Sequence, residues 1–488
     1  MENKNLIATP FIDGHSCPSA SEKTVEVRNP SNGEKIGDIP EGCGADAVRS
    51  VAAARGAFDS GVWNNSPPSF RAEVLHRWAD SIASEAAALN ALDASEMGKP
   101  VSESLFDAAA AARYARFYAE ATNKITGDVY ASDEHTLVAQ RFVPRGVVAA
   151  IIPWNFPAFN AVLKVAPALA AGNCVVLKPS ELSSRSAIRV ADLAIKAGLP
   201  SGVLNVVPGL GHTVGRALAL HDDVNMLTFT GSSEIGKLMI QYAGQSNMKL
   251  VLAECGGKSP QIVFDDGVDL DAASDFIARL FLTNQGQLCT AGSRLLVQKS
   301  IEEALLSRII SHIRKIVIGD ALDIKTTFGP VSSRKHLARV IERVENAVSE
   351  GASLEVGGRR VLEESGGYFV EPTIFRNVSP NSRLAHEEIF GPVLAVLPFE
   401  SESEAIRLAN NTVYGLAAYV WTANLSTGMR LAKAIRSSVL INSAAPTGEG
   451  AGYAVSSEPT GQSGIGTEGG LAGMQSYLRR QLLWFTHG

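Results

Sequence analysis

Cys289 is a candidate nucleophile because of the residues around it. It lies in the segment Asn-Gln-Gly-Gln-Leu-Cys-Thr-Ala-Gly at residues 284–292, a polar, glycine-flanked loop between a helical pattern and a strand pattern. A cysteine in such an accessible loop can have a lowered pKa, and its thiolate is a strong nucleophile. An arbitrary cysteine is more often a small buried hydrophobic residue, but this local sequence favours the reactive role.

Glu254 is a candidate general base. It ends the apolar run at residues 250–253 and is followed by Gly256 and Gly257. A carboxylate at the end of a strand and directed at a cleft can accept a proton. For this residue taken alone, the alternative is a solvated loop glutamate.

Asn155 is a candidate donor to a developing oxyanion. It lies between Pro153 and Pro157 at the end of an apolar run, and restricted backbone on both sides helps to fix the direction of its side chain. Its amide N–H could then stabilise negative charge that forms in a transition state. The alternative is an asparagine in an ordinary turn.

Alternating strand and helix patterns from about residue 145 must position these side chains. Apolar runs predict strands at residues 147–152, 174–177, 204–207, 226–229 and 250–253, and helical patterns predict helices at 158–171, 186–197, 214–220 and 235–242. This alternation is typical of a doubly wound α/β domain with a parallel sheet, in which ligands bind beyond the carboxyl ends of the strands.

A second α/β block is expected to follow. Its predicted strands are at residues 262–264, 295–297, 394–399 and 439–442, and its predicted helices are at 271–281 and 301–316. Residues 443–470 are dense in Gly, Ser, Pro and Thr and predict loops, whereas residues 477–485 predict a final strand.

The composition excludes several classes of protein. The 488 residues indicate two or three domains, and the formal net charge of −6, without a basic run, argues against a nucleic-acid partner. The five cysteines are odd in number and widely spaced, which argues against a disulfide framework or a metal site and favours a reducing compartment. Since no segment fits a secretory signal or a membrane span, we expect a cytoplasmic protein without a membrane partner.

Taken together, the segments around Asn155, Glu254 and Cys289 resemble the aldehyde dehydrogenase superfamily. Further segments fit the same family in the same order: Phe-Ile-Asp-Gly at residues 11–14, Asn-Pro at 29–30, Glu-Met-Gly-Lys-Pro at 96–100, Leu-Lys-Pro-Ser-Glu at 177–181, Phe-Thr-Gly-Ser at 229–232 and Glu-Glu-Ile-Phe-Gly-Pro-Val at 387–393. The resemblance covers nearly the whole chain. It is specific because all of these segments occur together and in the order of the family.

The resemblance implies the fold of that family, with a Rossmann-like doubly wound cofactor domain, an α/β catalytic domain and a small β oligomerisation arm. The implied division assigns residues 1–122 and 145–256 to NAD(P) binding and 257–442 to catalysis. Residues 443–470 would form loops that close the substrate tunnel, and residues 123–144 with 471–488 would form the arm. A homodimer or homotetramer is implied, in which the exposed strand edge at 478–485 pairs with a neighbouring subunit.

The resemblance also implies a role for each matching residue. Cys289 would attack the aldehyde carbon, Asn155 and the Cys289 backbone N–H would stabilise the oxyanion, hydride would pass to the nicotinamide, and Glu254 would activate the water that hydrolyses the thioester. The implied cofactor residues are Ile152, Trp154, Lys178, Ser180, Glu181, Gly231, Ser232, Gly236, Glu388 and Phe390. The implied substrate residues are Phe156, Asn160, Leu163, Leu288 and Thr290, and no metal is implied.

NAD is the expected cofactor, with NADP as the alternative. By the resemblance, Lys178 and Glu181 hold the adenosine ribose, and the carboxylate of Glu181 would repel a 2′-phosphate. The glycine-containing segment 209–215 follows a predicted strand, but its spacing does not fit a dinucleotide fingerprint, and we expect a turn there. The pyrophosphate is expected at Ser232, where a helix begins.

The sequence defines the substrate less closely. Segments 211–220, 242–249 and 289–294 look closest to the branch that oxidises ω-aminoaldehydes and their γ-glutamyl derivatives, whereas the mixed lining of the implied tunnel leaves an aromatic or medium aliphatic aldehyde open. The family loop Pro-Phe-Gly-Gly-x-Lys-x-Ser-Gly is replaced at residues 458–466 by Glu-Pro-Thr-Gly-Gln-Ser-Gly-Ile-Gly, without the phenylalanine and lysine, and Thr467 replaces the usual arginine.

Two alternative functions stay open at this level. A CoA-acylating aldehyde dehydrogenase is disfavoured because such relatives lack the glutamate that matches Glu254. A catalytically silent binding protein on the same fold is disfavoured because Cys289, Glu254 and Asn155 are all present.

Overall fold

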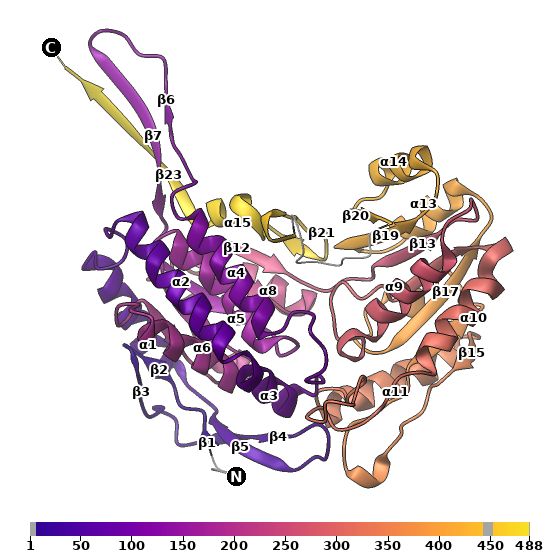
Figure 1. Ribbon diagram of the computed structural model, residues 1–488. Helices are drawn as coiled ribbons and strands as arrows, with labels where there is room; N and C mark the ends of the chain where they lie inside the picture. The colour runs from indigo at the N-terminus through magenta and orange to yellow at the C-terminus, as the bar shows by residue number, and fades with distance from the viewer. Residues whose placement is uncertain (1–5, 443–451, 488) are drawn as a thin grey trace.

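Two large sheets, each with helices packed against it, form the body of the protein (Figure 1). The computed structural model describes residues 6–442 and 452–487. The first sheet has eight strands in the order β22-β12-β11-β8-β9-β10-β2-β3. Its parallel centre consists of β8 (Val147–Ile151), β9 (Cys174–Lys178), β10 (Leu204–Val206), β11 (Met226–Thr230) and β12 (Leu250–Glu254). Its antiparallel edges are β2 (Phe11–Ile12), β3 (His15–Ser16) and β22 (Gly464–Ile465).

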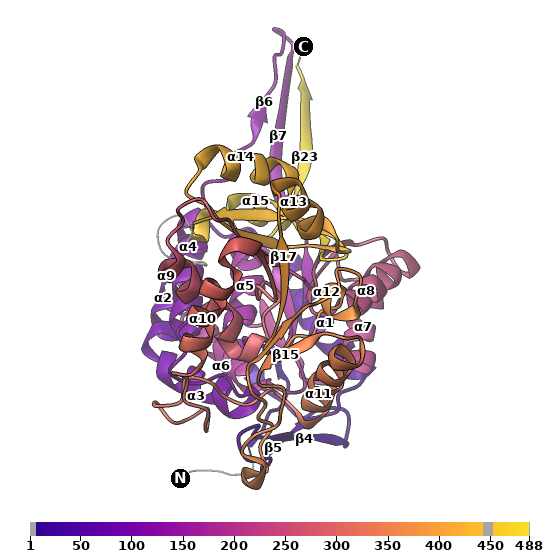
Figure 2. The same ribbon diagram turned by 90° about the vertical axis from the view of Figure 1, so that its right-hand side faces the viewer.

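Helices cover both faces of this sheet, which explains why its central strands are continuous apolar runs. Every residue of β8 and β9 is buried. One face is covered by α1 (Gly44–Asp59), α7 (Arg216–Leu220) and α8 (Ser233–Gln245). The other is covered by α5 (Pro157–Ala170) and α6 (Arg185–Lys196), with α2 (Pro68–Ser84), α3 (Ala86–Met97) and α4 (Ala108–Ala121) packed outside them (Figure 2).

The strand order reverses at β8, and this reversal fixes where a ligand can bind. The chain runs outward from β8 to β9 and β10, then returns to place β11 on the other side of β8. In open parallel sheets, the crevice for a ligand lies beyond the carboxyl ends of the strands at such a switch point. The segments that follow β8 and β11 are therefore the ones that border this crevice.

The second sheet has seven strands in the order β15-β16-β17-β14-β13-β19-β20. Six are parallel: β16 (Thr373–Arg376), β17 (Val393–Phe399), β14 (Arg294–Gln298), β13 (Pro260–Val263), β19 (Ala417–Trp421) and β20 (Ser438–Ile441). The antiparallel edge is β15 (Ser353–Val356). The accompanying helices are α9 (Leu270–Leu282), α10 (Glu302–Ile313), α11 (Arg334–Ser349), α12 (Arg383–His386), α13 (Glu402–Asn410) and α14 (Leu425–Ala434).

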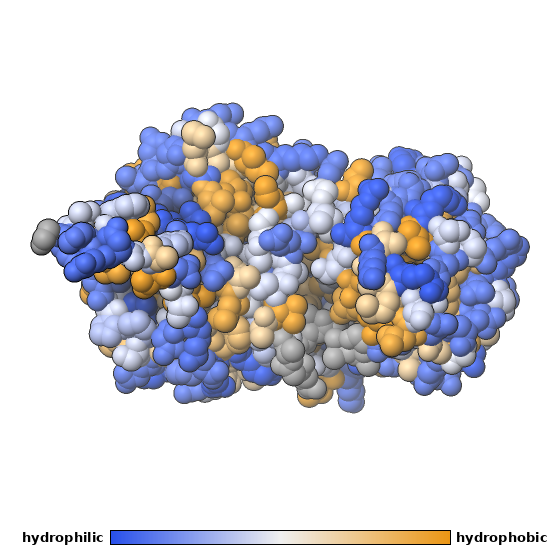
Figure 3. All heavy atoms as spheres, turned by 90° about the horizontal axis from the view of Figure 1, so that it is seen from above, coloured by the Kyte–Doolittle hydropathy of each residue, from blue (hydrophilic) through white to orange (hydrophobic). Residues whose placement is uncertain are grey.

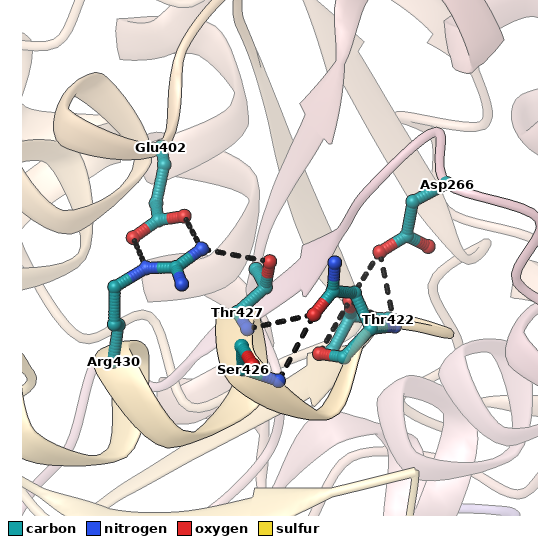
Figure 4. A network of polar contacts seen from close by, with 7 residues as sticks. Asp266, Glu402, Thr422, Ser426, Thr427 and Arg430 are labelled. Atoms are coloured by element: carbon teal, nitrogen blue, oxygen red, sulfur yellow. Dashed lines mark hydrogen bonds and ion pairs between the residues drawn. The ribbon is translucent and has the colours of Figure 1, made fainter.

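A polar network fixes the outer helices of this second block (Figure 4). Asp266, just beyond β13, accepts hydrogen bonds from the hydroxyl of Thr422 and the backbone N–H of Asn424, the latter at 3.3 Å. Asn424 in turn caps the first turn of α14 with its side chain. Arg430 in α14 forms two 2.7 Å bonds to the carboxylate of Glu402 in α13. These contacts link the loop after β19 to both helices.

A three-stranded antiparallel sheet projects from the first block and is called the arm below. It consists of β6 (Asp128–Val129), β7 (Thr136–Pro144) and the C-terminal β23 (Leu478–Thr486), with β7 in the middle. Both ribbon views show it standing clear of the body (Figures 1 and 2). The short α15 (Gly470–Ser476) leads into it from the C-terminal loops. A separate small sheet of β1 (Leu6–Ile7), β4 (Thr24–Arg28) and β5 (Lys35–Pro40) lies near the N-terminus.

The predicted alternation of parallel strands and helices is confirmed, with local differences. The turn expected at residues 209–215 is a π-helical turn over Gly211–Gly215 that continues into α7. The helix expected at 301–316 ends at Ile313. Strands β16 and β19 are additional, because short buried apolar runs do not distinguish a strand from a helix. Much of the predicted loop region lies in short elements, including β21 (Thr460–Gly461), while residues 443–451 lie outside the described part.

We propose that the predicted division of the chain corresponds to the two large sheets and the arm, with β22 from the predicted loop region added to the first sheet. In the described ranges, the chain has no helix with the length and apolarity needed to cross a bilayer.

Candidate active site

Three segments that are distant in sequence converge around Cys289. Cys289 lies between a short 3₁₀ turn (Thr283–Gly286) and β14, Glu254 is the last residue of β12, and Asn155 lies between β8 and α5. The Asn155 side-chain N–H donates to the carbonyl of Gln287 at 3.0 Å, two residues before Cys289. The carboxylate of Glu254 is close enough to raise the pKa of the Cys289 thiol. The candidate nucleophile, amide donor and base therefore share one site.

The side chain of Asn155 has a fixed orientation. It is buried, and its Oδ1 accepts a hydrogen bond from the amide of Asn160 at 3.3 Å. Because Oδ1 receives this bond and one N–H is bound to Gln287, the second Nδ2–H is left for a ligand. Asn160 was predicted as part of the substrate tunnel, and the contact shows that it also orients Asn155.

The loop before Cys289 adopts an unusual backbone conformation. Asn284, Gln285 and Gly286 have φ values of 46°, 57° and 70° in succession. A left-handed conformation at a non-glycine residue costs about 1–3 kcal/mol and is often found at functional sites. Hydrogen bonds hold it: Asn284 donates to the Asn155 carbonyl at 2.9 Å, and Gln287 donates to the Asn284 carbonyl at 3.0 Å. The loop carrying Cys289 is thus tied directly to the segment after β8.

Three glycines permit the segments to approach so closely. A Cβ atom at Gly257 would lie 2.4 Å from the carbonyl oxygen of Cys289, and one at Gly256 would lie 2.4 Å from a carboxylate oxygen of Glu388. A Cβ at Gly286 would lie 2.4 Å from the carbonyl of Gly391. The two glycines after Glu254 are therefore required by backbone contacts within the site.

Glu254 lies in an environment that favours its neutral form. Burial raises its pKa well above the ordinary value, the nearby carboxylate of Glu468 raises it further, and the ammonium group of Lys164 lowers it. Lys164 in α5 is completely buried and forms an ion pair with Glu468. A carboxyl group with a raised pKa is a stronger base once it is deprotonated.

The Cys289 thiol differs from its sequence-based prediction. We expected an accessible thiol with a lowered pKa, but burial raises the pKa of Cys289 to about 12, and the carboxylates of Glu388 and Glu254 also raise it. The thiol is partly exposed at the surface of the site and is surrounded by acidic rather than basic groups. Its activation therefore requires a base to remove the proton.

Residues at the end of β9 form the predicted ribose-binding group. Lys178 is buried, its Nζ donates to the Pro179 carbonyl at 2.7 Å, and it lies 3.8 Å from a carboxylate oxygen of Glu181. The Ser180 hydroxyl accepts a hydrogen bond from the backbone N–H of Leu182 at 3.2 Å, which stabilises the turn that contains Glu181. The backbone N–H of Ile152 bonds to the Lys178 carbonyl at 3.1 Å, which joins this turn to the end of β8.

The predicted pyrophosphate site is a helix N-terminus at the switch point. Ser232 is the N-cap of α8, and its side chain accepts the N–H of Ile235 at 3.4 Å. Gly231 precedes it at the end of β11. A Cβ at Gly236 would lie 2.5 Å from the sulfur of Cys255, so glycine allows the first turn of α8 to pack on β12. The N-terminus of such a helix favours an anion.

The predicted nicotinamide-binding residues form an aromatic corner. Phe390 has a φ of 58°, and its ring meets Trp154 edge-on with centroids 5.4 Å apart. The centre of the His336 imidazole lies 5.6 Å from the centre of the Trp154 ring, and its Nε2 donates to the Phe390 carbonyl at 2.7 Å. Because burial lowers the pKa of His336 to about 4, this ring is neutral at physiological pH. His336 thus holds Phe390 in its left-handed conformation.

Glu388 connects the cofactor corner to the segment after Glu254. Its carboxylate accepts the backbone N–H of Gly257 at 2.9 Å. Burial raises the pKa of Glu388 to about 7, while the Gly257 bond and the charge of Lys258 lower it. Lys258 is itself buried, and its Nζ has no hydrogen-bond partner among the described residues.

The remaining predicted substrate residues lie around Cys289 and along α5. Phe156 and Leu288 are buried, and the Thr290 carbonyl accepts a 3.0 Å bond from the Tyr419 hydroxyl. Leu163 borders a cavity of about 10 Å³ together with Glu468. Leu163 therefore borders the same small cavity as Glu468, the ion-pair partner of Lys164.

Three site residues, His336, Lys164 and Glu468, are absent from the sequence-based prediction. A signal existed for Lys164, because a lysine inside an otherwise apolar helical run must be paired when it is buried. No comparable local signal existed for His336, which reaches Phe390 from 54 residues away.

Comparison with known proteins gives a consistent result. The sequence model described as "Aldehyde dehydrogenase family" matches residues 17–483. The chain is 41% identical to the NADP/NAD-dependent aldehyde dehydrogenase PuuC of Escherichia coli (strain K12) over 98% of this chain and 95% of that protein.

Solved structures agree in fold over the same extent. An indole-3-acetaldehyde dehydrogenase in complex with NAD⁺ has a TM-score of 0.95 and 44% identity, covering 98% of this chain and 96% of the other. The γ-glutamyl-γ-aminobutyraldehyde dehydrogenase from Burkholderia cenocepacia J2315 has a TM-score of 0.95 and 42% identity, covering 100% and 97%.

The raised pKa of Cys289 leads to a testable expectation for its chemical reactivity. Because only the thiolate reacts rapidly with iodoacetamide, labelling of Cys289 in the cofactor-free protein should increase with pH to well above the ordinary thiol value. In Glu254→Gln, where a charge that raises the thiol pKa is absent, the same increase should occur at lower pH. Peptide mass spectrometry over a pH series measures both, with labelling of Cys17 as the internal control. Half-maximal labelling below pH 8 in the unmodified protein would contradict this expectation.

Proposed function

Because the chain belongs to the aldehyde dehydrogenase family, whose members oxidise an aldehyde to a carboxylic acid with NAD(P)⁺, we propose that Cys289, Glu254 and Asn155 perform this reaction here. The observation that carries the proposal is the hydrogen bond from Asn155 to the Gln287 carbonyl. It holds an amide donor beside the candidate nucleophile, in a site that also contains a buried carboxyl group.

The first covalent step joins the Cys289 sulfur to the aldehyde carbon. As the C–S bond forms, the C=O π electrons move to oxygen, and the thiol proton passes to Glu254. The free Nδ2–H of Asn155 and the backbone N–H of Cys289 then donate to the oxyanion. Loss of one such donor typically costs about 3–4 kcal/mol of transition-state stabilisation.

The cofactor-side residues fit a dinucleotide. The N-cap at Ser232 offers backbone N–H groups to a pyrophosphate, the Lys178–Glu181 pair offers hydrogen bonds to a ribose, and the hydroxyl of Thr230 is buried without a partner among the described residues. When bound, NAD(P)⁺ supplies the acceptor for the hydride. Phe390 and Trp154 would exclude water on that side, and Glu388 would orient the second ribose.

Glu254 also serves the hydrolytic half of the reaction in this proposal. After oxidation the substrate is a thioester on Cys289, and Glu254 has released to solvent the proton that it took from the thiol. The Glu254 carboxylate then removes a proton from water as the water oxygen attacks the acyl carbon. The C–S bond then breaks, and the sulfur leaves as a thiol or thiolate. Glu468 and Lys164 lie next to Glu254 and adjust the pKa at which it can accept a proton.

NAD is the proposed preferred cofactor. The carboxylate of Glu181 is partly exposed beside Lys178, where it can accept hydrogen bonds from both ribose hydroxyls and would repel a 2′-phosphate. NADP is the weaker alternative under this proposal.

A run of aromatic rings leads away from Asn155 and suggests the class of substrate. The run contains Phe156, Phe106, Phe159, Tyr114 and Tyr453, in that order. The distances between the ring centroids of successive members are 5.1, 5.0, 5.9 and 6.0 Å. Phe156, Phe159 and Tyr114 are buried, so these rings form an apolar wall next to the proposed oxyanion donor. We therefore propose an aldehyde with an aromatic or aliphatic body.

The charges along this run disfavour a cationic tail. Arg113 donates to the hydroxyl of Tyr453 at 2.8 Å at the outer end, and the ammonium of Lys99 lies 5.9 Å from the centre of the Phe156 ring at the inner end. Lys99 is buried and faces the carboxylates of Glu103, Asp93 and Asp107. A protonated ω-aminoaldehyde would therefore meet positive charge mainly at Arg113. The predicted aminoaldehyde is therefore the second choice, although relatives such as the aminoacetaldehyde dehydrogenase of Pseudomonas aeruginosa carry such names.

The arm supports a proposal of self-association into a homodimer or homotetramer. Leu482, Trp484 and Phe485 on its edge strand are 56%, 65% and 53% exposed, and an apolar strand edge of this kind is usually covered by another chain. A cytoplasmic location is also proposed, because all five cysteines are free, as expected in a reducing compartment.

The Cys289→Ser variant should lose more than about 1,000-fold in NADH formation, because a serine hydroxyl is a poorer nucleophile at neutral pH. NAD⁺ binding, measured by calorimetry, should be retained. The matched control is Cys17→Ser, which replaces a partly exposed thiol remote from the site. A Cys289→Ser enzyme with normal turnover would remove Cys289 from the mechanism.

The Glu254→Gln variant should give a rapid burst of NADH followed by slow turnover, because acyl transfer to water lacks its base. A general base typically contributes about 100- to 10,000-fold. In the unmodified enzyme, hydrolysis-limited turnover should rise with pH through the raised pKa of Glu254, since only the carboxylate accepts a proton. This rise should be absent in the variant. Rapid-mixing kinetics measure burst and steady state, and an unchanged steady state would exclude Glu254 as the base.

A panel of aldehydes should show higher kcat/KM for phenylacetaldehyde and hexanal than for 4-aminobutanal. Changing Arg113 to Gln should raise kcat/KM for 4-aminobutanal several-fold and leave hexanal nearly unchanged, because it removes a cation from the outer end of the aromatic run. Added CoA should not accelerate NADH formation. Preference for 4-aminobutanal in the unmodified enzyme would contradict the proposed substrate class, and CoA dependence would support the acylating alternative.

A further inference from the structure

The loop that carries Cys289 is held on two sides, and the two sides belong to different blocks of the molecule. Seen from above, the two blocks stand side by side, with hydrophobic surface on each of them (Figure 3). The first block holds the loop before Cys289, because the Asn155 amide donates to the Gln287 carbonyl. The second block holds the segment after Cys289 through side chains that have no role in the reaction described above.

Two polar side chains of the second sheet make these contacts. The hydroxyl of Tyr419 in β19 donates to the Thr290 carbonyl at 3.0 Å. The side-chain amide of Gln261 in β13 donates to the Gly292 carbonyl at 2.8 Å. Tyr419 and Gln261 are paired directly in neighbouring parallel strands, so their side chains lie on the same face of the sheet. These two side chains are called the clamp below.

Packing fixes both members of the clamp. Tyr419 is 4% exposed, and the ring of Phe276 in α9 lies against its ring with centroids 5.4 Å apart. Phe276 also packs against Trp421, two residues further along β19, at a centroid distance of 5.7 Å. Gly292 approaches Gln261 so closely that an added Cβ would lie 2.3 Å from the Cγ of that side chain. The two donor groups are therefore held at fixed positions over the sheet.

Thr290 connects the clamp to the thiol of Cys289. Burial raises the pKa of this thiol and nearby carboxylates raise it further, whereas a hydrogen bond from the backbone N–H of Thr290 lowers it. The Thr290 N–H and the Cys289 carbonyl belong to one planar peptide unit. An added Cβ at Gly257 would lie 2.4 Å from that carbonyl oxygen. The direction of the N–H therefore depends on the packing at Gly257 and on the bond from Tyr419 to the next peptide unit.

The hydroxyl of Tyr419 is suited to donating a hydrogen bond and not to acting as an acid or a base. Burial raises its pKa, hydrogen bonding with Thr290 lowers it, and the negative charge of Cys289 raises it further, so that the net change is upward. The hydroxyl therefore keeps its proton at physiological pH. Because Tyr419 is neutral, it can hold the loop without adding charge to a site that already contains several carboxyl groups.

We propose that Tyr419 is a positioning residue for the nucleophile, and that its hydroxyl, together with the Gln261 amide, directs the Thr290 N–H at the Cys289 sulfur. The sulfur carries negative charge before the C–S bond forms and again when that bond breaks. A fixed N–H donor stabilises this charge at both moments without reorganisation of the site. The inference rests on the proposed function, because it names a residue that serves the proposed nucleophile.

The decisive variant is Tyr419→Phe, which keeps the ring and removes only the hydroxyl. Labelling of Cys289 by iodoacetamide at pH 8 should become about threefold slower, because the thiolate loses a well-directed donor. The burst of NADH should slow by about 10- to 100-fold, since a small displacement of a reacting group costs this much. The Kd for NAD⁺ should stay unchanged. Peptide mass spectrometry, rapid-mixing kinetics and calorimetry measure the three quantities.

Three further variants separate a positioning role from a purely structural one. Ser50→Ala is the control, because it removes another buried hydroxyl that donates to a backbone carbonyl, at 2.8 Å in α1, and it should leave labelling and burst unchanged. Replacement of Tyr419 by para-aminophenylalanine keeps an N–H donor on the ring and should restore both quantities. Gln261→Met removes the second donor of the clamp and should slow labelling in the same direction, which tests the clamp with the Tyr419 ring and hydroxyl intact.

The outcomes distinguish failure of this inference from failure of the proposed function. Unchanged labelling and an unchanged burst in Tyr419→Phe would overturn the inference and leave the proposed function intact. Slow labelling that para-aminophenylalanine does not restore would also overturn it, because the effect would then come from packing and not from the donor. Normal turnover of Cys289→Ser would overturn the proposed function, and with it the role of Tyr419 in catalysis.

Discussion

The approach of Gly257 to the carbonyl oxygen of Cys289 is the contact on which the site depends. These residues belong to different sheets, since Gly257 follows β12 of the first and Cys289 precedes β14 of the second. With no room for a Cβ at Gly256, Gly257 or Gly286, the three segments form a single packed unit. The Glu388 carboxylate closes this unit by accepting the Gly257 N–H. A shift of one sheet relative to the other would therefore move the thiol, the base and the cofactor corner together.

Burial of charge follows from this close packing and defines the chemistry. Burial raises the pKa of Glu254, Glu388 and Cys289. The carboxylate of Glu468 raises the pKa of Glu254 further, and those of Glu388 and Glu254 raise the pKa of Cys289 further. The buried Lys164, held by Glu468, supplies one compensating positive charge next to Glu254. The carboxyl groups of Glu254 and Glu388 therefore hold a proton more readily than ordinary carboxyl groups, and each is a stronger base once that proton has left. This differs from the cationic surroundings that activate many catalytic cysteines.

The sequence was sufficient for those features that depend on local pattern. Buried strands β8 and β9 are continuous apolar runs, and Glu254 and Cys289 lie where such runs end or begin, so their neighbourhood at the sheet edge follows from parallel topology. Features that depend on long-range packing could not be predicted in this way. The contact of His336 with Phe390 and the pair of Lys164 with Glu468 join residues 54 and 304 positions apart. The thiol pKa was predicted in the wrong direction, because loop polarity does not report which charges other segments bring to the loop.

The altered C-terminal loop shows how such a site can change at its entrance and keep its interior. Ser463 accepts the Cys255 N–H at 2.8 Å, donates to the Gly256 carbonyl at 2.7 Å, and accepts the Gly415 N–H at 3.0 Å. These bonds lie next to Glu254, and they form although the loop lacks the phenylalanine and lysine that are usual in the family.

Thr467, in place of an arginine, bonds to Glu458 and leaves Lys164 as the cation paired with the adjacent Glu468. An arginine at position 467 would add positive charge near the carboxylates that raise the pKa of Glu254, and would lower that pKa. Threonine at position 467 therefore adds no positive charge near the base. Differences in substrate between this chain and its relatives are then expected to arise at the entrance and along the aromatic run rather than at the proton acceptor.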